Sequence, residues 1–577
     1  SNKIAFRYKE KGDWKSISHK ELFSLSLKIA FSLNELGLIK GDRVLLLSEN
    51  RIEWIIFDIA FSHLGIVSVP VFSTTSSKQL DYIINHSECK AVVVSNKYQL
   101  KKIEEIREDI PSVKLFISID ECETTISEIK RYKQLLHNVE TTEHILAEFI
   151  NQKASSIKTE DLLTIIYTSG TTGNPKGVML SNKNIIANLR AILDTGYFNN
   201  MQRSLSYLPL CHAYERTAGY YLIYSTGCII TLCENLDSIS SYLLESKPQL
   251  MTTVPELMEK IRMRIHNSMN RESERKQKIF NWAIKVGKDY VNTKTNNNRS
   301  LLRSLKFKIA DILVYSKIKD KMGGSLEYLV SGGAAMNYET AIFFEMLNVK
   351  TLQGYGLTEA SPVISFNLPH SNELDTVGKP LNNIEVKIAD DGEILCRGES
   401  IMMGYFNDKE GTEKTIDSEK WLYTGDIGKF TELGNLKITD RKKNIFVNSS
   451  GKNVAPQIIE NEALKSRFIE QICLIGNDRP FCTALIYPNV DQILYIAKKL
   501  EVKGDFIELI HNPKIQNFVK NDIDYNLTSL SKFEQIRKFT LLEKPFSLEN
   551  GELSHKMAIK RHIIDEKYKD IIESMYL

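Results

Sequence analysis

Short, almost uninterrupted apolar runs alternate with helical patterns through the first 440 residues, and this alternation limits the fold more than any other feature. The runs include residues 43–48 (RVLLLS), 66–71 (IVSVPV), 90–95 (KAVVVS) and 229–232 (IITL). Residues 51–64, between the first two runs, have the period of a helix. Strands that are apolar on both sides are typical of parallel sheets covered by helices on both faces. The sequence therefore predicts an α/β fold with parallel-type sheets.

The 577 residues of the chain are enough for more than one domain. We expect a large multi-layer N-terminal domain at residues 1–439 and a smaller, mobile α+β domain at 440–577. The charged run 440–443 (DRKK) lies at this boundary, and strand-like runs resume at 472–476 and 483–487. The 75 Lys and Arg nearly balance the 72 Asp and Glu, so bulk charge gives no support for nucleic-acid binding.

Cysteine usage and hydropathy bear on the cellular compartment. Eight cysteines are scattered without a C-x-x-C pair, which argues against a zinc cluster or a disulfide framework and fits a reducing cytoplasm. The most apolar stretch, residues 54–72, is interrupted by Asp58, His63, Gly65 and Pro70, so we do not expect it to span a bilayer. The N-terminal residues lack the pattern of a signal peptide. We therefore expect a cytoplasmic enzyme.

Residues 261–325 differ from the rest of the chain because they are rich in Lys, Arg and Asn. Within them, the apolar residues of 279–287 (IFNWAIKVG) have the spacing of one helix face, and 296–298 (NNN) predicts a loop between two helices. Two interpretations are open: a solvated helical hairpin, which we favour, and a basic surface that touches lipid or a partner. The second would place the protein peripherally at the inner face of the membrane. A homodimer is also compatible with the sequence.

The most informative segment runs from Tyr167 to Gly177 (YTSGTTGNPKG), between two strand-like runs. Its glycines let the backbone approach a ligand, its hydroxyls and N–H groups supply donors, and Lys176 adds a positive charge. This composition predicts a cradle for a polyphosphate. The spacing of a P-loop NTPase cannot be drawn through it, and a flexible surface linker would need neither the lysine nor this position.

With this loop the sequence resembles the adenylate-forming superfamily, which includes acyl-CoA synthetases, peptide-synthetase adenylation domains and luciferases. Three further motifs occur in the expected order: residues 353–359 (QGYGLTE) resemble the second signature, 421–426 (WLYTGD) the ribose-binding motif, and 440–443 (DRKK) the hinge. The resemblance covers essentially the whole chain. It implies that a carboxylate attacks the α-phosphate of ATP, giving an acyl-adenylate and pyrophosphate, and that a thiol then attacks the acyl carbon.

The resemblance also implies which residues hold the phosphates and the metal. Thr358 would bind the α-phosphate, and Glu359, with Thr168, would bind Mg²⁺, a hard cation that prefers oxygen ligands. Lys176 would neutralise phosphate charge during a step that joins two anions. The other expected phosphate contacts are Thr168, Ser169, Gly170, Thr171, Thr172 and Gly173.

For the nucleoside, the resemblance implies a second group of contacts. Asp426 would accept hydrogen bonds from both ribose hydroxyls, and Arg441 would donate to one of them. Tyr355 would offer a flat face to adenine. The opposite wall and the remaining contacts are expected at Gly333, Ala334, Ala335, Gln353, Gly354 and Gly356.

The acyl substrate is indicated by residues 208–216 (LPLCHAYER), which resemble the matching segment of long-chain acyl-CoA synthetases. His212 would then be a catalytic residue beside the acyl-adenylate, although a structural histidine is the plainer alternative. Residues 273–287 also resemble that subgroup. Together the two segments favour a medium- to long-chain fatty acid and leave its length open.

For the thiol, residues 449–455 (SSGKNVA) follow the hinge. In the family this loop comes to face the active site when the small domain rotates about the hinge residue, here Lys443. Ser450 and Gly451 would admit the pantetheine arm, and Lys452 would meet phosphate charge. Coenzyme A is favoured over a tethered carrier because we find no carrier domain with its serine attachment motif.

The segment 551–561 (GELSHKMAIKR) departs from the family pattern. An ungapped alignment puts Ala558 where the family has a lysine that bonds the carboxylate and the α-phosphate, with Lys556 and Lys560 two residues away on either side. Losing one preorganised cationic donor costs about 3–4 kcal/mol. We therefore expect weak adenylation and a nearly normal thioester step, unless a local shift brings Lys556 into the catalytic position.

These features predict an ATP-dependent fatty acid–CoA ligase that uses ATP, Mg²⁺ and coenzyme A and releases AMP and pyrophosphate. One alternative is a fatty acyl-AMP ligase that loads a carrier protein. A second is a catalytically impaired relative that binds acyl groups or nucleotide, suggested by Ala558 alone. A luciferase-type monooxygenase is a third, and it would emit light with luciferin and oxygen.

Overall fold

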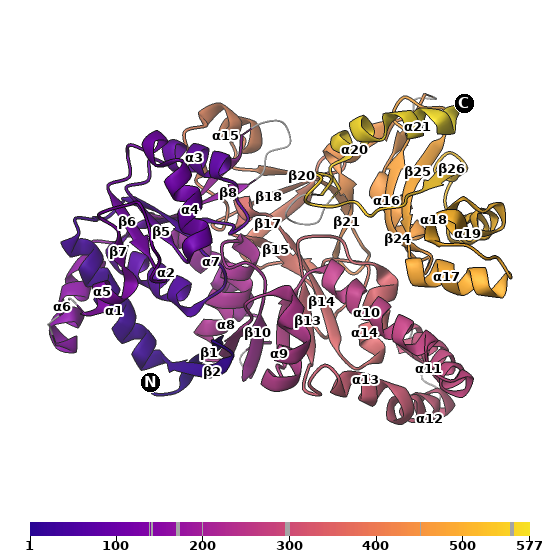
Figure 1. The fold of residues 1–577 in the computed structure, drawn as a ribbon, viewed down its shortest axis with the longest axis horizontal. Helices are drawn as coiled ribbons and strands as arrows, with labels where there is room; N and C mark the ends of the chain where they lie inside the picture. The colour runs from indigo at the N-terminus through magenta and orange to yellow at the C-terminus, as the bar shows by residue number, and fades with distance from the viewer. Residues whose placement is uncertain are drawn as a thin grey trace.

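The computed structural model describes residues 1–137, 139, 142–168, 174–198, 200–294, 301–449, 452–553 and 559–577. Figure 1 shows two α/β masses side by side and, at the upper right, a separate lobe formed by the C-terminal residues. Among the described residues, no helix has both the length and the apolar character needed to cross a bilayer.

An eight-stranded sheet with a parallel centre forms the left-hand mass of Figure 1. The predicted strands at 43–48, 66–71 and 90–95 are confirmed as three of its members. Two of them are buried at every residue, as expected for strands covered on both faces. The strands lie in the order β19 (Gly404–Tyr405), β9 (Lys176–Ser181), β8 (Leu162–Thr168), β4 (Val67–Val71), β3 (Arg43–Leu47), β5 (Ala91–Val94), β6 (Leu115–Ser118) and β7 (Lys130–Arg131).

Helices cover this sheet. The predicted helix at 51–64 is confirmed as α2, and it ends at Gly65, whose φ of 69° is the left-handed conformation that favours glycine. The bounds are α1 (His19–Glu35), α2 (Ile52–Leu64), α3 (Ser77–His86), α4 (Lys97–Glu105), η1 (Arg107–Asp109), α5 (Tyr132–His137) and α6 (Glu143–Ala154).

A nine-stranded sheet forms the second mass, with a parallel centre and antiparallel strands at its two edges. The predicted run 229–232 is confirmed as one of its central strands. The order is β16 (Lys379–Pro380), β15 (Val363–Phe366), β14 (Lys350–Gly356), β13 (Tyr328–Ser331), β12 (Leu250–Thr253), β10 (Arg203–Ser206), β11 (Ile229–Leu232), β1 (Ile4–Glu10) and β2 (Asp13–Ser18). The associated helices are α7 (Asn182–Leu193), η2 (Glu215–Tyr221), α8 (Leu222–Ser225), η3 (Leu236–Ser238), α9 (Ile239–Ser246), α14 (Tyr338–Met346) and η5 (Thr358–Ala360).

The described residues of the segment 261–325 are mostly helical, and the core face of these helices packs on the nine-stranded half of the molecule. The face predicted from residues 279–287 is largely buried: Phe280 and Ala283 lie in a core cluster, and Gly287 lies against Met346. Ile279 is exposed instead. The predicted loop 296–298 lies outside the described residues. The helices are α10 (Pro255–Asn270), α11 (Glu274–Lys294), α12 (Leu301–Ala310), η4 (Asp311–Tyr315) and α13 (Ser316–Asp320).

A four-stranded antiparallel sheet connects the large part of the chain to the C-terminal lobe. Its last strand runs on to Arg441, so Asp440 and Arg441 lie in a strand, and only the rest of the predicted charged run lies beyond it. The elements are β17 (Ile384–Ile388), β18 (Glu393–Gly398), β20 (Leu422–Phe430), β21 (Leu436–Arg441) and α15 (Lys409–Thr415).

The C-terminal lobe is built on a mixed three-stranded sheet with its own core cluster. The predicted strands at 472–476 and 483–487 are confirmed within it. It contacts α10 of the large part, where Asn267 donates a hydrogen bond to Asp491 (2.8 Å). Its elements are η6 (Lys442–Asn444), β22 (Phe446–Val447), β23 (Asn453–Val454), α16 (Pro456–Ala463), β24 (Ile469–Ile475), β25 (Cys482–Pro488), α17 (Val490–Lys499), α18 (Phe506–His511), α19 (Pro513–Asn526), β26 (Ile536–Leu541), α20 (Arg561–Lys567) and α21 (Lys569–Tyr576).

Candidate functional site

The predicted phosphate cradle connects two strands of a hairpin. β8 and β9 are antiparallel neighbours, and Thr168 pairs with Lys176 at the end of their ladder next to the connecting loop. The candidates Ser169, Gly170, Thr171, Thr172 and Gly173 lie outside the described residues. The described part of the hairpin therefore provides the two ends of the loop, Thr168 and Lys176.

Lys176 lies beside Asp408 and Tyr405, two residues that were not predicted from the sequence. Its Nζ is 3.2 Å from Oδ2 of Asp408 and 4.6 Å from the centre of the Tyr405 ring. The N–H of Gly411 and, more weakly, Lys176 lower the pKa of Asp408. Because the Lys176 side chain is still 41% exposed, its ammonium group remains accessible to an anionic ligand.

Tyr405 joins Lys176 to Glu359. Its hydroxyl donates a hydrogen bond to Oε1 of Glu359 (3.0 Å), and the backbone N–H of Met402 donates to the Glu359 carbonyl oxygen (2.8 Å). The β8–β9 hairpin and residues 353–359 therefore meet around one tyrosine. The only signal in the sequence was the turn-forming run 404–408 (GYFND), which by itself predicts a turn.

A helix cap holds the chain that leads to Tyr405. Ser181 and Asn184 form a capping box at the start of α7. The Asn184 amide also donates to the carbonyl oxygens of Glu399 (2.7 Å) and Ile401 (2.8 Å). β19 then pairs with β9, with Tyr405 opposite Val178. These contacts fix the backbone that places the Tyr405 ring beside Lys176.

The residues predicted to bind the nucleoside, two for the ribose and one for adenine, form a second cluster. Tyr355 donates its hydroxyl hydrogen to Oδ2 of Asp426 (2.7 Å), and Nε of Arg441 lies 3.1 Å from Oδ1. The positions of Asp426 and Arg441 are opposite each other in the β20–β21 ladder. Burial and, next, the charge of Asp426 keep the pKa of Tyr355 well above its usual value, so the hydroxyl remains a donor. The carboxylate is 7% exposed and the guanidinium side chain 58% exposed.

Gln353, Gly354 and Tyr355 follow one another along β14. Gln353 is buried, and its amide oxygen accepts a hydrogen bond from the N–H of Met336 (3.4 Å). A Cβ at Gly354 would make only an ordinary contact with Phe366 (3.5 Å). The side chain of Gln353 therefore joins two segments of the protein, which is a structural task.

Gly356 and Thr358 lie in the tight turn that ends the second signature. A Cβ at Gly356 would lie 1.7 Å from the carbonyl oxygen of Pro362, so only glycine fits there. The adjacent N–H of Leu357 donates to the same oxygen (3.0 Å). Thr358 is buried and is followed directly by Glu359. Tyr355 and Glu359 are four residues apart, so at most about 14 Å of chain separates the two clusters.

Gly333, Ala334 and Ala335 form an exposed turn after β13. Gly333 has a φ of 84°, which favours glycine. A Cβ at the preceding Gly332 would lie 3.1 Å from the Tyr214 ring, and Tyr214 donates to the carbonyl oxygen of Val330 (2.6 Å). The strand that leads into the predicted adenine wall therefore packs on the segment 208–216.

His212 lies in the turn before η2. Its Nδ1 accepts the backbone N–H of Tyr214 (3.2 Å), so the neutral ring carries its proton on Nε2. The Phe72 ring lies 6.3 Å from the His212 ring, centre to centre. Asn50 holds the same turn from the other sheet: its amide donates to the Leu208 carbonyl oxygen (2.7 Å), and its oxygen accepts from the Leu210 N–H (3.0 Å).

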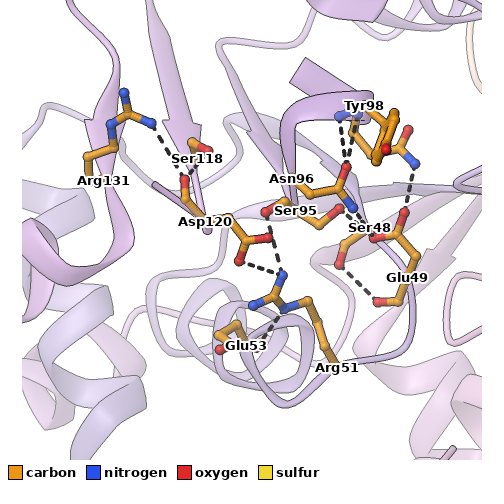
Figure 2. Close-up of polar contacts among 11 residues, drawn as sticks. Ser48, Glu49, Arg51, Glu53, Ser95, Asn96, Tyr98, Ser118, Asp120 and Arg131 are labelled. Atoms are coloured by element: carbon orange, nitrogen blue, oxygen red, sulfur yellow. Dashed lines mark hydrogen bonds and ion pairs between the residues drawn. The ribbon is translucent and has the colours of Figure 1, made fainter. Parts of the chain in front are cut away.

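Figure 2 shows the polar network that supports the loop carrying Asn50. Glu49 accepts hydrogen bonds from Ser95 (2.5 Å) and Gln99 (2.7 Å), and Arg51 pairs with Glu53 (2.7 Å) and Asp120 (3.0 Å). Glu49, Arg51, Ser95 and Asp120 follow the carboxyl ends of β3, β5 and β6, where loops of a parallel sheet gather, and Glu53 and Gln99 lie in the helices that come next. Because the network pairs acids with donors, it fixes the loop and hence the turn of His212.

Glu215 anchors the helical end of the segment 208–216. It is completely buried, and its carboxylate oxygens accept hydrogen bonds from the hydroxyls of Ser206 (2.5 Å) and Thr252 (2.7 Å). A Cβ at Gly219 would lie 2.4 Å from the carboxyl carbon, so glycine leaves the room that the carboxyl fills. Burial raises the pKa of Glu215 to about 7.

The predicted hinge begins next to an ion-pair cluster. Lys442 lies 2.6 Å from Asp391 and 2.8 Å from Glu393, and these two carboxylates raise its pKa. The backbone of Lys443 continues in η6. Lys452 is exposed, with its Nζ 4.5 Å from the centre of the Phe533 ring. The candidates Ser450, Gly451 and Lys556, together with Ala558, lie outside the described residues.

Known proteins resemble the chain over its whole length. Residues 1–406 match the family model of the AMP-binding enzymes, and residues 443–577 match that of the AMP-binding enzyme C-terminal domain. A peroxisomal long-chain acyl-CoA synthetase 6 of Arabidopsis thaliana is 31% identical over 98% of this chain and 82% of its own length. The long-chain-fatty-acid–CoA ligase FadD15 of Mycobacterium bovis is 29% identical over 98% of this chain and 93% of its own length.

Among solved structures, the anthranilate CoA ligase AuaEII in complex with anthranoyl-AMP has the same fold. Its TM-score is 0.73, with 17% identity over 99% of this chain and 95% of that one. The α/β fold expected from the sequence is therefore confirmed. With family models matching both parts of its length, the chain belongs to the AMP-binding, adenylate-forming enzymes, in their long-chain fatty acyl-CoA synthetase group.

Proposed function

We propose that this protein ligates a medium- to long-chain fatty acid to coenzyme A with ATP, through an acyl-adenylate, and releases AMP and pyrophosphate. The observation that carries the proposal is the arrangement at the end of β14, where the Lys176–Tyr405–Glu359 cluster and the Tyr355–Asp426–Arg441 cluster are joined by one short stretch of chain. One cluster suits phosphates and the other suits a ribose. The long-chain acyl-CoA ligases among its relatives support the acyl substrate.

At the phosphate end, the residues match the charge of Mg-ATP. Lys176 offers a partly exposed cation. The hydrogen bond that Glu359 accepts from Tyr405 comes from a neutral hydroxyl, so the carboxylate keeps its negative charge for a cation. Carboxylate and hydroxyl oxygens, from Glu359 and Thr168, suit Mg²⁺, which when bound would neutralise phosphate charge. Thr358 and the turn 169–173 would complete the phosphate contacts.

At the nucleoside end, Asp426 would bind the ribose while keeping its protein partners. Each carboxylate oxygen has two lone pairs, so an oxygen that already accepts from Tyr355 or Arg441 can accept from a ribose hydroxyl as well. The exposed Arg441 side chain can turn toward the ligand. Adenine would lie between the Tyr355 ring and the turn 333–335.

The second half-reaction would use the C-terminal lobe. We propose that this lobe turns about Lys443 and that Ser450 and Gly451 then line the path of the pantetheine arm, with Lys452 meeting the phosphates of coenzyme A. The Lys442 pairs with Asp391 and Glu393 would have to open or follow that movement. His212 would contact the acyl-adenylate.

The function is tested by measuring AMP, pyrophosphate and acyl-CoA for a panel of fatty acids with Mg-ATP and coenzyme A. We expect AMP and thioester in equal amounts, with the highest kcat/KM for medium or long chains. Acyl-adenylate without free thioester, together with loading of an added carrier protein, would instead support the acyl-AMP ligase. Absence of pyrophosphate release with every acid would contradict the proposal.

Ala558 is tested in the same assay. If the alignment is right, Ala558→Lys restores a cationic donor and raises pyrophosphate release by about two to three powers of ten. The parent protein, which has Ala558, should convert a pre-made acyl-adenylate and coenzyme A to thioester at a nearly normal rate. Should Lys556 already occupy the catalytic position, Lys556→Ala will abolish adenylation and Ala558→Lys will add little.

Two finer predictions concern the partners of the protein. A homodimer stays a prediction, and sedimentation equilibrium over a range of protein concentrations would detect it. Peripheral contact with a membrane also stays a prediction.

A further inference from the structure

Six apolar side chains lie exposed along α12 and the turn that follows it. Leu305 is 57% exposed and Ile312 70% exposed, and steps of three or four residues link Leu301, Leu305, Ile309 and Ile312. This spacing puts them on one face of the helix. Single exposed apolar residues are ordinary, whereas a continuous apolar patch marks a contact surface. The exposed apolar face of α12 and the adjoining η4, which we call the α12 stripe, consists of Leu301, Leu302, Leu305, Ile309, Ile312 and Leu313.

The opposite face of the same helix is already packed on the protein. Phe307 stacks on Tyr290 of α11, with ring centres 4.1 Å apart. Ala310 and Val314 are buried in the core cluster of this half of the molecule, and Tyr315 donates to the carbonyl oxygen of Ala283. This packed face anchors the helix, and within the described part of the chain the α12 stripe stays exposed.

Charge indicates what that partner is. Residues 301–321 contain six Lys or Arg and two Asp, and Lys306, Lys308 and Lys317 are exposed beside the α12 stripe. An apolar helix face flanked by lysines is typical of segments that lie in the interface of an anionic bilayer. The neighbouring α11 adds Ile279 and Trp282, which are also exposed.

We propose that the α12 stripe docks on the surface of an anionic lipid bilayer. This inference rests on the proposed function. A long-chain fatty acid partitions into bilayers, so an enzyme bound to the bilayer surface meets its substrate at a high local concentration. The stripe residues lie apart from Lys176, Glu359 and Asp426 in the sequence and belong to neither cluster. Docking would therefore change the supply of substrate and leave the chemical step as it is.

The test is cosedimentation of the full chain with fatty-acid-free vesicles, either of phosphatidylcholine alone or of equal parts phosphatidylcholine and phosphatidylglycerol, without nucleotide. We expect binding to the mixed vesicles and at least about tenfold weaker binding to phosphatidylcholine alone. Because no substrate is present, failure here with normal ligase activity would overturn the docking and leave the function in place. Normal docking without ligase activity would do the opposite.

A triple variant distinguishes binding through the α12 stripe from non-specific binding of exposed apolar residues to vesicles. Leu305→Gln, Ile309→Gln and Ile312→Gln keep helix-forming residues and should abolish detectable vesicle binding. The control replaces exposed apolar residues elsewhere, Ile39→Gln and Leu433→Gln, each 63% exposed, and should bind like the parent. Equal binding by the triple variant and the parent would overturn the proposal. So would a dimer in the parent that the triple variant abolishes, since a second copy would then cover this face.

A charge variant sharpens the lipid assignment. Lys306→Gln, Lys308→Gln and Lys317→Gln should weaken binding to the mixed vesicles by about a hundredfold. Three exposed lysines at the far end of the molecule in Figure 1, on α3, α4 and α15, give the matched control: Lys78→Gln, Lys101→Gln and Lys409→Gln. Equal loss in both sets would mean that net charge, rather than this face, binds the lipid, and it would contradict the proposal.

Discussion

Two aspartates in the large part of the chain have the same kinds of partner. Asp58 and Asp426 each accept a tyrosine hydroxyl hydrogen on one oxygen, at 2.7 Å in both cases, and face an arginine with the other. The partners are Tyr221 and Arg216 for Asp58, and Tyr355 and Arg441 for Asp426.

The two trios differ in access. The side chains of Asp58 and Arg216 are 1% and 2% exposed, and Arg216 donates a further hydrogen bond to the hydroxyl of Thr164 (2.8 Å). Arg441 is 58% exposed although its aspartate is almost covered. The arginine of the closed trio is buried among its partners, whereas the exposed arginine of the open trio can still offer a cation to a ligand. The same chemistry therefore serves the fold in one place and is available for binding in the other.

The largest effect is expected at the closed trio. Asp58→Ala leaves Arg216 buried without its carboxylate, which should lower the free energy of unfolding by about 3–5 kcal/mol. Urea denaturation measures this. Asp426→Ala is the matched change at the open trio and should cost about 1 kcal/mol or less in stability, because Arg441 then turns to solvent. Equal losses in both variants would break the comparison.

The next effect concerns the other open cation, Lys176. Lys176→Met removes a charge that we propose faces the phosphates of ATP, and it should lower the rate of acyl-adenylate formation by about 10²–10³-fold, about 2.7–4 kcal/mol. Lys183→Met, at a similarly exposed lysine paired with Glu399, is the control and should keep the rate. Pyrophosphate release at saturating ATP is the readout, and an unchanged rate in Lys176→Met would contradict its placement.

A buried carboxyl extends the comparison to pH. The folded pKa of Glu215 is about 7 against 4.5 in the reference state, so between these values the folded protein keeps a proton that the unfolded chain releases. The contribution to stability is therefore complete below about pH 4.5 and is lost as the pH rises through 7. Glu215→Gln removes this dependence and should gain up to about 3 kcal/mol relative to the parent between pH 4.5 and pH 8. Thermal unfolding of the variant and the parent at both pH values measures the gain. The same difference in stability between the two proteins at pH 4.5 and at pH 8 would contradict the prediction.

The smallest effects come from removing one hydroxyl from each trio. Tyr221→Phe takes a donor from buried Asp58 and should lower the free energy of unfolding by about 1–3 kcal/mol. Tyr355→Phe should leave stability within about 1 kcal/mol of the parent and weaken ATP binding several-fold. Calorimetry gives both numbers, and an unfolding loss at Tyr355 as large as that at Tyr221 would remove the distinction.

Much of the fold was predictable because its central strands are buried on both faces, so their apolar runs carry no competing pattern. The runs at 43–48 and 90–95 are strands for that reason. The trio of Asp426, Tyr355 and Arg441 was also assembled from motifs, and the structure brings these three side chains together.

Contacts made by isolated residues far apart in the sequence could not be predicted. Tyr405 reaches Glu359 because β19 pairs with β9, and Asn50 reaches the turn of His212 from another sheet. Neither pairing leaves a local pattern. Within residues 261–325 the sequence left a lipid contact open but did not identify the α12 stripe. The helix is apolar on two faces, and periodicity alone does not say which of them the core will cover.

The central claim is that the open trio and the Lys176–Glu359 cluster hold one ATP molecule between them. A crystal structure of the protein with Mg-ATP tests it most directly. The account predicts both ribose hydroxyls within hydrogen-bonding distance of Asp426 and the triphosphate along the turn after Thr168, next to Lys176. A nucleotide bound anywhere else, or a protein that does not bind ATP at all, would contradict it.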